Sequence, residues 1–173
     1  MLGFWSKVEE GTIPTRVTHN DTKINNILFD RQGEVLCAID LDTVMASTSL
    51  NDFGDAIRSY ANTGDEDDRD LSRVGLSLEM FRAYTEGYLS QRAKQLTDSE
   101  IDHLAFSARY ITFEQVLRFL MDYIDGDTYY KVKYPGHNLV RTHAQYRLLQ
   151  SMEEHYGEMC RIVRETVDKY RKA

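Results

Sequence analysis

Apolar residues follow two patterns along the chain, short runs near the start and long helical stripes after that. Residues 27–29 and 35–39 are brief apolar runs on either side of a glycine-containing polar stretch, so we expect a β-hairpin there. Before it, the first ten residues predict a short helix that Gly11 and Pro14 bring to an end.

Helical spacing takes over after residue 43. The predicted helices cover about 52–61, 76–93, 98–124 and 138–172. Asp52 and Asn138 are the expected caps of the first and last, and Thr97 with Glu100 has the spacing of a capping box. Because strands come first and helices follow, we expect an α+β fold, mostly α, in a single domain over residues 1–173.

Composition and net charge limit the classes of partner that the chain can bind. The chain is 42% hydrophobic and 28% charged with a net charge of −7, which argues against nucleic acid because phosphate binding needs a basic face. No apolar run approaches the roughly 18 residues of a membrane helix, and no secretory signal is visible. Two cysteines are too few for a disulfide scaffold. We therefore expect a cytoplasmic protein that does not interact with membranes.

The chemistry concentrates in one loop and the strand that follows it. His19-Asn20-Asp21-Thr22-Lys23-Ile24-Asn25-Asn26 leads directly into an apolar strand, and Asp40 closes the next one. Asn26 begins one arm of the hairpin and Asp40 ends the other, so the hairpin should bring them close together.

These residue types suit phosphoryl transfer. Asp21 can accept a hydrogen bond from a substrate hydroxyl, and Asn26 and Asp40 offer hard oxygen ligands for Mg²⁺ on the phosphates of ATP. Lys23 can reach the transferring phosphoryl group as a point charge. His19 is expected to orient the loop through hydrogen bonds.

Three aspartates that follow the loop, Asp40, Asp42 and Asp52, have to be assigned to metal, substrate or structural roles. Asp52-Phe53-Gly54 spells the metal motif of protein kinases, yet it opens a helix, whereas Asp40 follows an apolar strand. We assign the metal to Asp40 and a structural role to Asp52. Asp42 is either an exposed turn residue or a second contact to metal or substrate.

The loop and Asp40 together resemble the protein-kinase-like fold in its small-molecule branch, which includes aminoglycoside phosphotransferases, choline kinases and sugar kinases. The resemblance extends from about Pro14 onward and implies the C-terminal lobe of that fold, a small β-hairpin bearing the catalytic loop beside a helical bundle. In that branch an aspartate at the position of Asp52 braces the loop.

Further stretches, among them residues 52–58 and 118–127, resemble the sugar kinases of this branch that phosphorylate the anomeric hydroxyl of N-acetylhexosamines. The resemblance implies ATP and a sugar as substrates, with Arg118, Asp122 and Tyr123 as candidate sugar contacts. Arg118 and Asp122 are also spaced as an ordinary helical ion pair. A choline or aminoglycoside kinase remains an alternative.

The two-lobed fold also needs an N-terminal nucleotide lobe, and this sequence has no Gly-x-Gly and few residues before His19. We expect that lobe to be absent, so the chain alone should be inactive, or a non-catalytic module that binds sugar or a protein. Leu2, Phe4 and Trp5 would then lose their cover, and we expect self-association, with the first helix folded against its own lobe or against a neighbouring copy.

Overall fold

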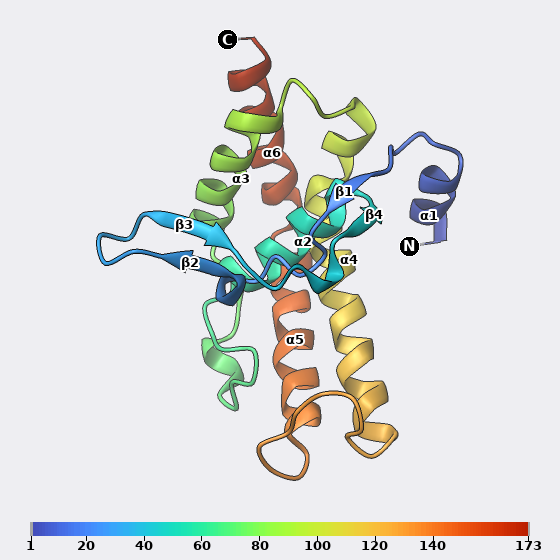
Figure 1. The fold of residues 1–173 in the computed structure, drawn as a ribbon, viewed down its shortest axis with the longest axis vertical. Helices are drawn as coiled ribbons and strands as arrows, with labels where there is room; N and C mark the ends of the chain where they lie inside the picture. The colour runs from blue at the N-terminus through green and yellow to red at the C-terminus, as the bar shows by residue number, and fades with distance from the viewer. Residues whose placement is uncertain (1, 173) are drawn as a thin grey trace.

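The computed structural model of the chain describes residues 2–172, with the side chain of Leu2 outside the described part. The helices are α1 (Leu2–Glu9), α2 (Ser49–Tyr60), α3 (Leu78–Arg92), α4 (Asp98–Ile124), α5 (His137–Glu154) and α6 (Tyr156–Arg171). The strands are β1 (Arg16–Thr18), β2 (Ile27–Phe29), β3 (Val35–Ala38) and β4 (Met45–Ser47). Short 3-10 turns cover Ile24–Asn26 (η1), Leu41–Thr43 (η2) and Leu71–Arg73 (η3). The mostly helical α+β architecture agrees with the prediction (Figure 1).

Residues 16–47, the strand segment, form two separate antiparallel pairs. β2 and β3 make the predicted hairpin, with Ile27 opposite Ala38 and an irregularity between Leu28 and Phe29. Its turn is held by Asp30, whose Oδ1 accepts hydrogen bonds from two later backbone amides. β1 pairs with β4, a contact that the local sequence pattern did not predict.

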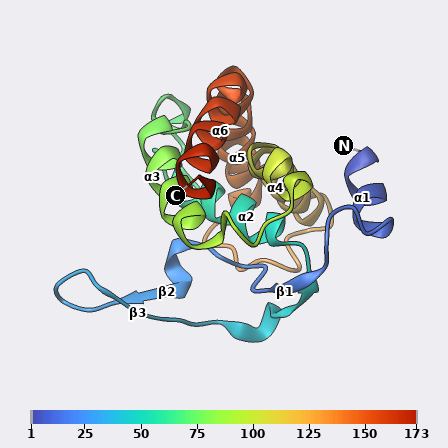
Figure 2. The same cartoon turned by 90° about the horizontal axis from the view of Figure 1, so that it is seen from above.

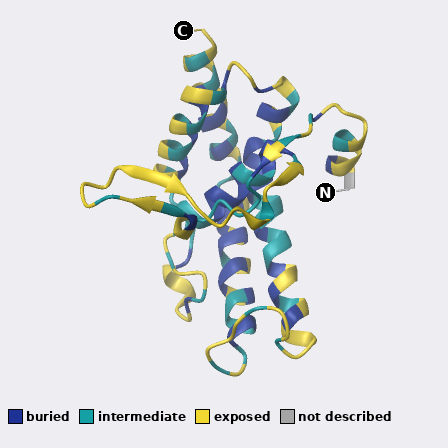
Figure 3. Cartoon of the chain, in the orientation of Figure 1, coloured by how far each residue is buried: buried dark blue, intermediate teal, exposed yellow. Residues whose placement is uncertain are grey.

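Residues 49–171, the helical body, contain almost all of the apolar core. α4 packs against both α2 and α5, and α3 packs against α6. Phe53, Leu104 and Leu148 are completely buried where these helices meet. Viewed from above, the strand segment runs along one side of the body (Figure 2), and its hairpin projects away from it with most residues exposed (Figure 3).

Close packing of α2 on α4 depends on Gly54. A Cβ built there would lie 2.5 Å from the backbone oxygen of Ser107 and 2.7 Å from Ile111. Phe53 beside it is fully buried. The Asp-Phe-Gly sequence is therefore a helix-packing feature in this chain.

The N-terminal helix α1 packs against α4 of the helical body. Phe4 is only 3% exposed because its ring packs against Phe106 and Tyr110 of α4. Trp5 is 42% exposed, and its indole nitrogen donates to the Tyr110 hydroxyl at 2.7 Å. The helix therefore folds onto its own body, which is one of the two arrangements expected from the sequence.

Three helix ends also differ from the sequence prediction. α2 begins at Ser49 with Thr48 as its cap, so Asp52 lies inside the helix. α5 follows Gly136 in the left-handed conformation, while Asn138 is buried in the first turn. The predicted final helix is interrupted at His155, whose amide and ring both contact the Ser151 carbonyl.

The capping box predicted at the start of α4 is present, with Thr97 and Glu100 bonded reciprocally. Within residues 2–172, no helix has an apolar stretch of the length and low charge needed to cross a bilayer.

Candidate functional site

Asp52, a side chain of the helical body, holds the loop between β1 and β2. Asp52 on α2 accepts a hydrogen bond from the His19 amide at 3.1 Å and from the Asn20 amide at 2.7 Å. The backbone carbonyl of Asp52 accepts a third hydrogen bond from Thr22 at 2.6 Å. Both carboxylate oxygens of Asp52 are thereby committed to the loop, an arrangement suited to bracing it.

His19 ties the same loop to the end of the hairpin. Its Nδ1 accepts from the Asp21 amide at 3.3 Å, so in the neutral ring Nε2 carries the proton and donates to the Ile39 carbonyl at 2.9 Å. The His19 carbonyl in turn accepts from the Thr43 hydroxyl at 2.6 Å. This geometry gives His19 an orienting role.

Asp21 presents its two carboxylate oxygens differently. Oδ2 accepts from Lys23 at 2.7 Å and from the Asn26 side-chain amide at 2.8 Å. Asn26 also donates to the Asp21 backbone carbonyl, which fixes the separation of the two residues. The other carboxylate oxygen, Oδ1, is left for a further donor, such as a substrate hydroxyl.

Asp40 lies beside Asn26 because the hairpin register brings their backbones together. The Ile39 amide donates to the Asn26 carbonyl at 2.9 Å. Asp40 follows in a left-handed conformation with φ of 62° and is exposed. Since Asn26 uses its amide nitrogen on Asp21, its side-chain oxygen is the atom that can serve as a ligand.

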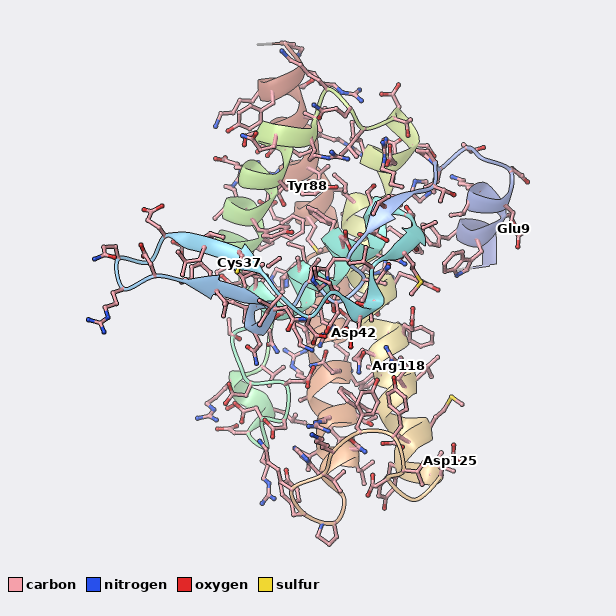
Figure 4. The ribbon with its side chains drawn as sticks, in the orientation of Figure 1. Glu9, Cys37, Asp42, Tyr88, Arg118 and Asp125 are labelled. Atoms are coloured by element: carbon pink, nitrogen blue, oxygen red, sulfur yellow. The ribbon has the colours of Figure 1, made fainter. Side chains whose placement is uncertain are left out.

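The pair of Asn26 and Asp40 fits Mg²⁺ in donor type, since that ion prefers oxygen ligands and binds through few side chains when phosphates supply the rest. Among the described residues, no group of three or more His, Cys, Asp or Glu side chains could hold a metal by itself. Asp42 is exposed in the turn that follows (Figure 4).

A cavity of about 370 Å³, the catalytic cavity, opens beside Asp21. Its walls come from the loop before β2, from η2, from α2 and the segment after it, from the last third of α4 with the loop that follows, and from the beginning of α5. Besides Asp21 it is lined by Asn20, Lys23, Asn25, Thr43, Arg58, Glu66, Gln115, Arg118, Phe119, Tyr129, Tyr130 and Arg141. The cavity thus combines the Asp21 carboxylate with three arginines and two tyrosines.

Of the predicted sugar contacts, Arg118 lines this cavity and the other two do not. Arg118 projects from α4 (Figure 4), with its guanidinium 5.9 Å from the ring centre of Tyr129 and 5.6 Å from that of Tyr130. Tyr123 is 39% exposed on α4 and absent from the described lining. The structure therefore brings only Arg118 of this set to Asp21.

Asp122 holds the loop that follows α4. It is 6% exposed and accepts hydrogen bonds from the backbone amides of Thr128, Tyr129 and Tyr130. Burial would raise the pKa of Asp122, but these amides outweigh it and lower that pKa. Asp122 forms no ion pair with Arg118 among the described side chains. It anchors the loop that carries the two tyrosines to the cavity.

Arg58 forms the floor of the cavity and was missed by the sequence analysis. Only 6% exposed, it contacts Asp55 at 2.9 Å and Glu66 at 2.8 Å. Burial would lower the pKa of Arg58, yet these two carboxylates raise it. Burial also raises the pKa of Asp55, against the pull of Arg58. The three-residue spacing of Asp55 and Arg58 on a helix was the available signal.

Part of the chain is similar to a known protein family. A family model described as "Phosphotransferase enzyme family" matches residues 4–96, which is more than half of the chain. The matched part contains the loop, the hairpin, Asp40 and α2. The residues of α4 and α5 that line the catalytic cavity lie beyond it.

Proposed function

The chain belongs to the phosphotransferase enzyme family, and from that premise we propose that it is the catalytic and substrate-binding lobe of a small-molecule kinase. The observation that carries this proposal is the Asp21 carboxylate, with one oxygen held by Lys23 and Asn26 and the residue itself at the wall of a cavity. An ATP-dependent transfer to an alcohol group uses such a carboxylate and the oxygen ligands beside it.

In this reaction Asp21 accepts a hydrogen bond from the acceptor hydroxyl and takes up its proton as the oxygen attacks the γ-phosphorus, while the bond from that phosphorus to the bridging oxygen breaks and ADP leaves. Asn26 and Asp40 would hold Mg²⁺, which neutralises phosphate charge when bound. Lys23 lies 2.7 Å from Asp21, close enough to place a positive charge at the reacting oxygens. His19 and Asp52 hold the loop in place.

For the acceptor we propose a neutral sugar, with phosphorylation at the anomeric hydroxyl as in N-acetylhexosamine 1-kinases. Three arginines, Arg58, Arg118 and Arg141, line the catalytic cavity. Its wall has one carboxylate besides Asp21, Glu66, and that carboxylate is already paired with Arg58. This charge distribution disfavours the cationic choline and aminoglycoside acceptors of other members of the branch.

For the nucleotide we propose a second lobe that covers the strand segment, as in the protein-kinase-like fold. Val17, Val35 and Leu36 are each more than 60% exposed, and Leu41 and Met45 extend the same apolar character. Without that lobe the chain holds only the metal side of the nucleotide site. We expect weak ATP binding, little turnover and association between copies through this surface. A non-catalytic sugar-binding module is the alternative.

The test compares this chain alone with a two-lobed protein, in which it follows a nucleotide-binding lobe of the same family. ADP release would be measured with N-acetylglucosamine, N-acetylgalactosamine, choline and an aminoglycoside. We expect sugar-dependent ADP release from the two-lobed protein and almost none from the chain alone. Release with choline or the aminoglycoside only would reject the sugar, and no release with any acceptor would favour the non-catalytic module.

A further inference from the structure

Glu66 is the second carboxylate in the wall of the catalytic cavity, together with Asp21. Its Oε1 accepts a hydrogen bond from Arg58 at 2.8 Å, and the buried Arg58 also donates to Gln145 of α5 at 3.3 Å. No described residue donates to Oε2, the other carboxylate oxygen of Glu66. With its side chain 44% exposed, Glu66 is fixed at one oxygen and leaves the other for a molecule in the cavity.

The loop that carries Glu66, residues 61–70, is held in place by the next residue, Asp67. Its Oδ2 accepts hydrogen bonds from His137 Nε2 at 2.7 Å and from Lys133 Nζ at 3.2 Å. His137 is completely buried, and its Nδ1 accepts from the Lys133 amide at 3.2 Å, so the neutral ring carries its proton on Nε2 and donates it to Asp67. Asp67 thereby ties this loop to the beginning of α5.

Two further features strengthen this connection. The hydrogen bond from His137 lowers the pKa of Asp67, with help from Lys133 and against the effect of burial. Hydrogen bonds to an ionised carboxylate are stronger than those between neutral groups. The guanidinium of Arg69 lies 4.3 Å from the ring centre of Tyr134, and that ring packs on His137. The loop after α2 and the loop after α4 are therefore joined at more than one point.

The unused oxygen of Glu66 limits what can bind beside it. An ionised carboxylate only accepts hydrogen bonds, so the bound group must be a donor. An ammonium group is disfavoured by Arg118 and Arg141, which line the same cavity and form no ion pair with a described carboxylate. A hydroxyl group is the neutral donor that an alcohol acceptor supplies, and a cavity of about 370 Å³ has room for more than the reacting one.

We infer that Glu66 binds a non-reacting hydroxyl group of the acceptor through Oε2, and that Asp67 is the positioning residue that holds Glu66 there. The inference rests on the proposed function, because Asp21 in the same cavity must receive the reacting hydroxyl of that molecule. It makes Glu66 a specificity-determining residue that favours acceptors with at least two hydroxyl groups.

The test measures binding of N-acetylglucosamine and its 3-, 4- and 6-deoxy analogues to the 173-residue chain by calorimetry or ligand-observed NMR. We expect one deoxy sugar to bind about 10- to 100-fold more weakly than the full sugar, the effect of one hydrogen bond to a charged acceptor. In Glu66→Gln, the amide oxygen stays with Arg58 and the NH₂ group replaces Oε2. That difference should therefore shrink to less than about threefold, while the other two analogues keep their ratios.

Asp67→Ala should raise KM for N-acetylglucosamine in the two-lobed protein about three- to tenfold and leave kcat within about twofold, since Glu66 touches no reacting atom. Asp67→Asn keeps an oxygen for His137 and should restore most of the affinity. Glu153→Ala is the matched control, because Glu153 pairs with Arg109 between α5 and α4 and neither residue lines the cavity. It should alter thermal stability only.

The contact with Glu66 would be overturned by equal losses for each deoxy sugar in the parent and in Glu66→Gln, or by no sugar binding at all. The positioning role would be overturned if Asp67→Ala leaves KM unchanged, or if it lowers kcat and stability together as a general loss of folding would. The proposed function is judged separately by Asp21→Asn in the two-lobed protein. Retained transfer there would reject the kinase proposal without altering the binding ratios of the deoxy sugars.

Discussion

The strand segment and the helical body keep their shapes by different means. Apart from Phe4 and Ile13, every member of the buried apolar core belongs to the helical body or to the loops between its helices. In contrast, β3 is exposed at all of its positions, and η2 contains no buried residue. The strand segment is held instead by hydrogen bonds such as those from its backbone to Asp52.

This difference separates chemistry from stability. A side chain in the strand segment can be changed without opening the apolar core, whereas a side chain buried in α2 or α4 cannot. Activity should therefore be most sensitive to the first region and the free energy of unfolding to the second. The following experiments would break or sharpen that separation.

The largest effect is expected for Asp21→Asn. Removal of the proton-accepting carboxylate should lower kcat of the two-lobed protein roughly 10²- to 10⁴-fold. Stability should change little, because the side chain is partly exposed and packs against no core residue. Steady-state kinetics and thermal unfolding would be measured side by side. Activity within about twofold of the parent would remove Asp21 from the mechanism.

Phe53→Ala tests the opposite side of the comparison. The ring is fully buried and contacts Tyr88 and Phe81 edge to face, so its removal should cost about 3–5 kcal/mol in the free energy of unfolding. Val35→Ala in the hairpin, at a position 63% exposed, is the control and should cost less than about 0.5 kcal/mol. Urea unfolding of the 173-residue chain would measure both. Similar losses would mean that the hairpin is part of the stabilising core.

Asp52→Ala tests the contact between the two regions. Two backbone amides of the loop lose a charged acceptor, so the loop should position Asp21 less accurately and kcat should fall roughly 10- to 100-fold. Asp102→Ala, at an exposed position of α4, should leave kcat unchanged. If Asp52→Ala abolishes the Mg²⁺ dependence and Asp40→Ala does not, the metal assignment belongs to Asp52.

The smallest effect on kcat is expected for Glu100, which links the helical body to β1 and should act on stability instead. Burial opposes its ionisation, but Arg16, the Thr97 amide and Ser49 overcome this and lower the pKa of Glu100 to about 2 from 4.5. Its stabilising contribution is therefore complete above about pH 4.5 and is lost as the pH falls toward 2. Glu100→Gln should flatten acid unfolding in that range, and Glu79→Gln, at an exposed position, should not. Identical acid profiles for the parent and Glu100→Gln would contradict the assignment.

The sequence predicted most where local rules decide the structure. The hairpin follows from two apolar runs and a turn, and the start of α4 follows from a capping box that needs only Thr97 and Glu100. Asn138 has the residue type of a cap, yet its amide donates to Asp122 and Asp127. These partners are distant along the chain, so local preference could not reveal them.

The residues of the candidate site also fall into two groups, those of one contiguous loop and those brought together by helix packing. The loop around Asp21 is contiguous and its residue types are distinctive, so a role in phosphoryl transfer could be proposed for it from the sequence. Arg58 and Gln145 meet only because α2 and α5 both pack on α4, and neither belongs to a recognisable motif. Asp122 looked like a surface residue with a helical ion partner, but the loop after α4 folds back over it.

Asn20 and Asp40 share a left-handed backbone, with φ of 63° and 62°. Apart from glycine, only asparagine and aspartate adopt that conformation routinely. Two requirements therefore restrict the residue at position 40, the left-handed backbone and the proposed binding of a metal. Glutamate keeps the charge but fits this backbone poorly, whereas glycine fits the backbone but has no carboxylate. Few substitutions at position 40 can therefore keep both properties. A lineage that has lost Asp40 is expected to regain activity only through aspartate or asparagine.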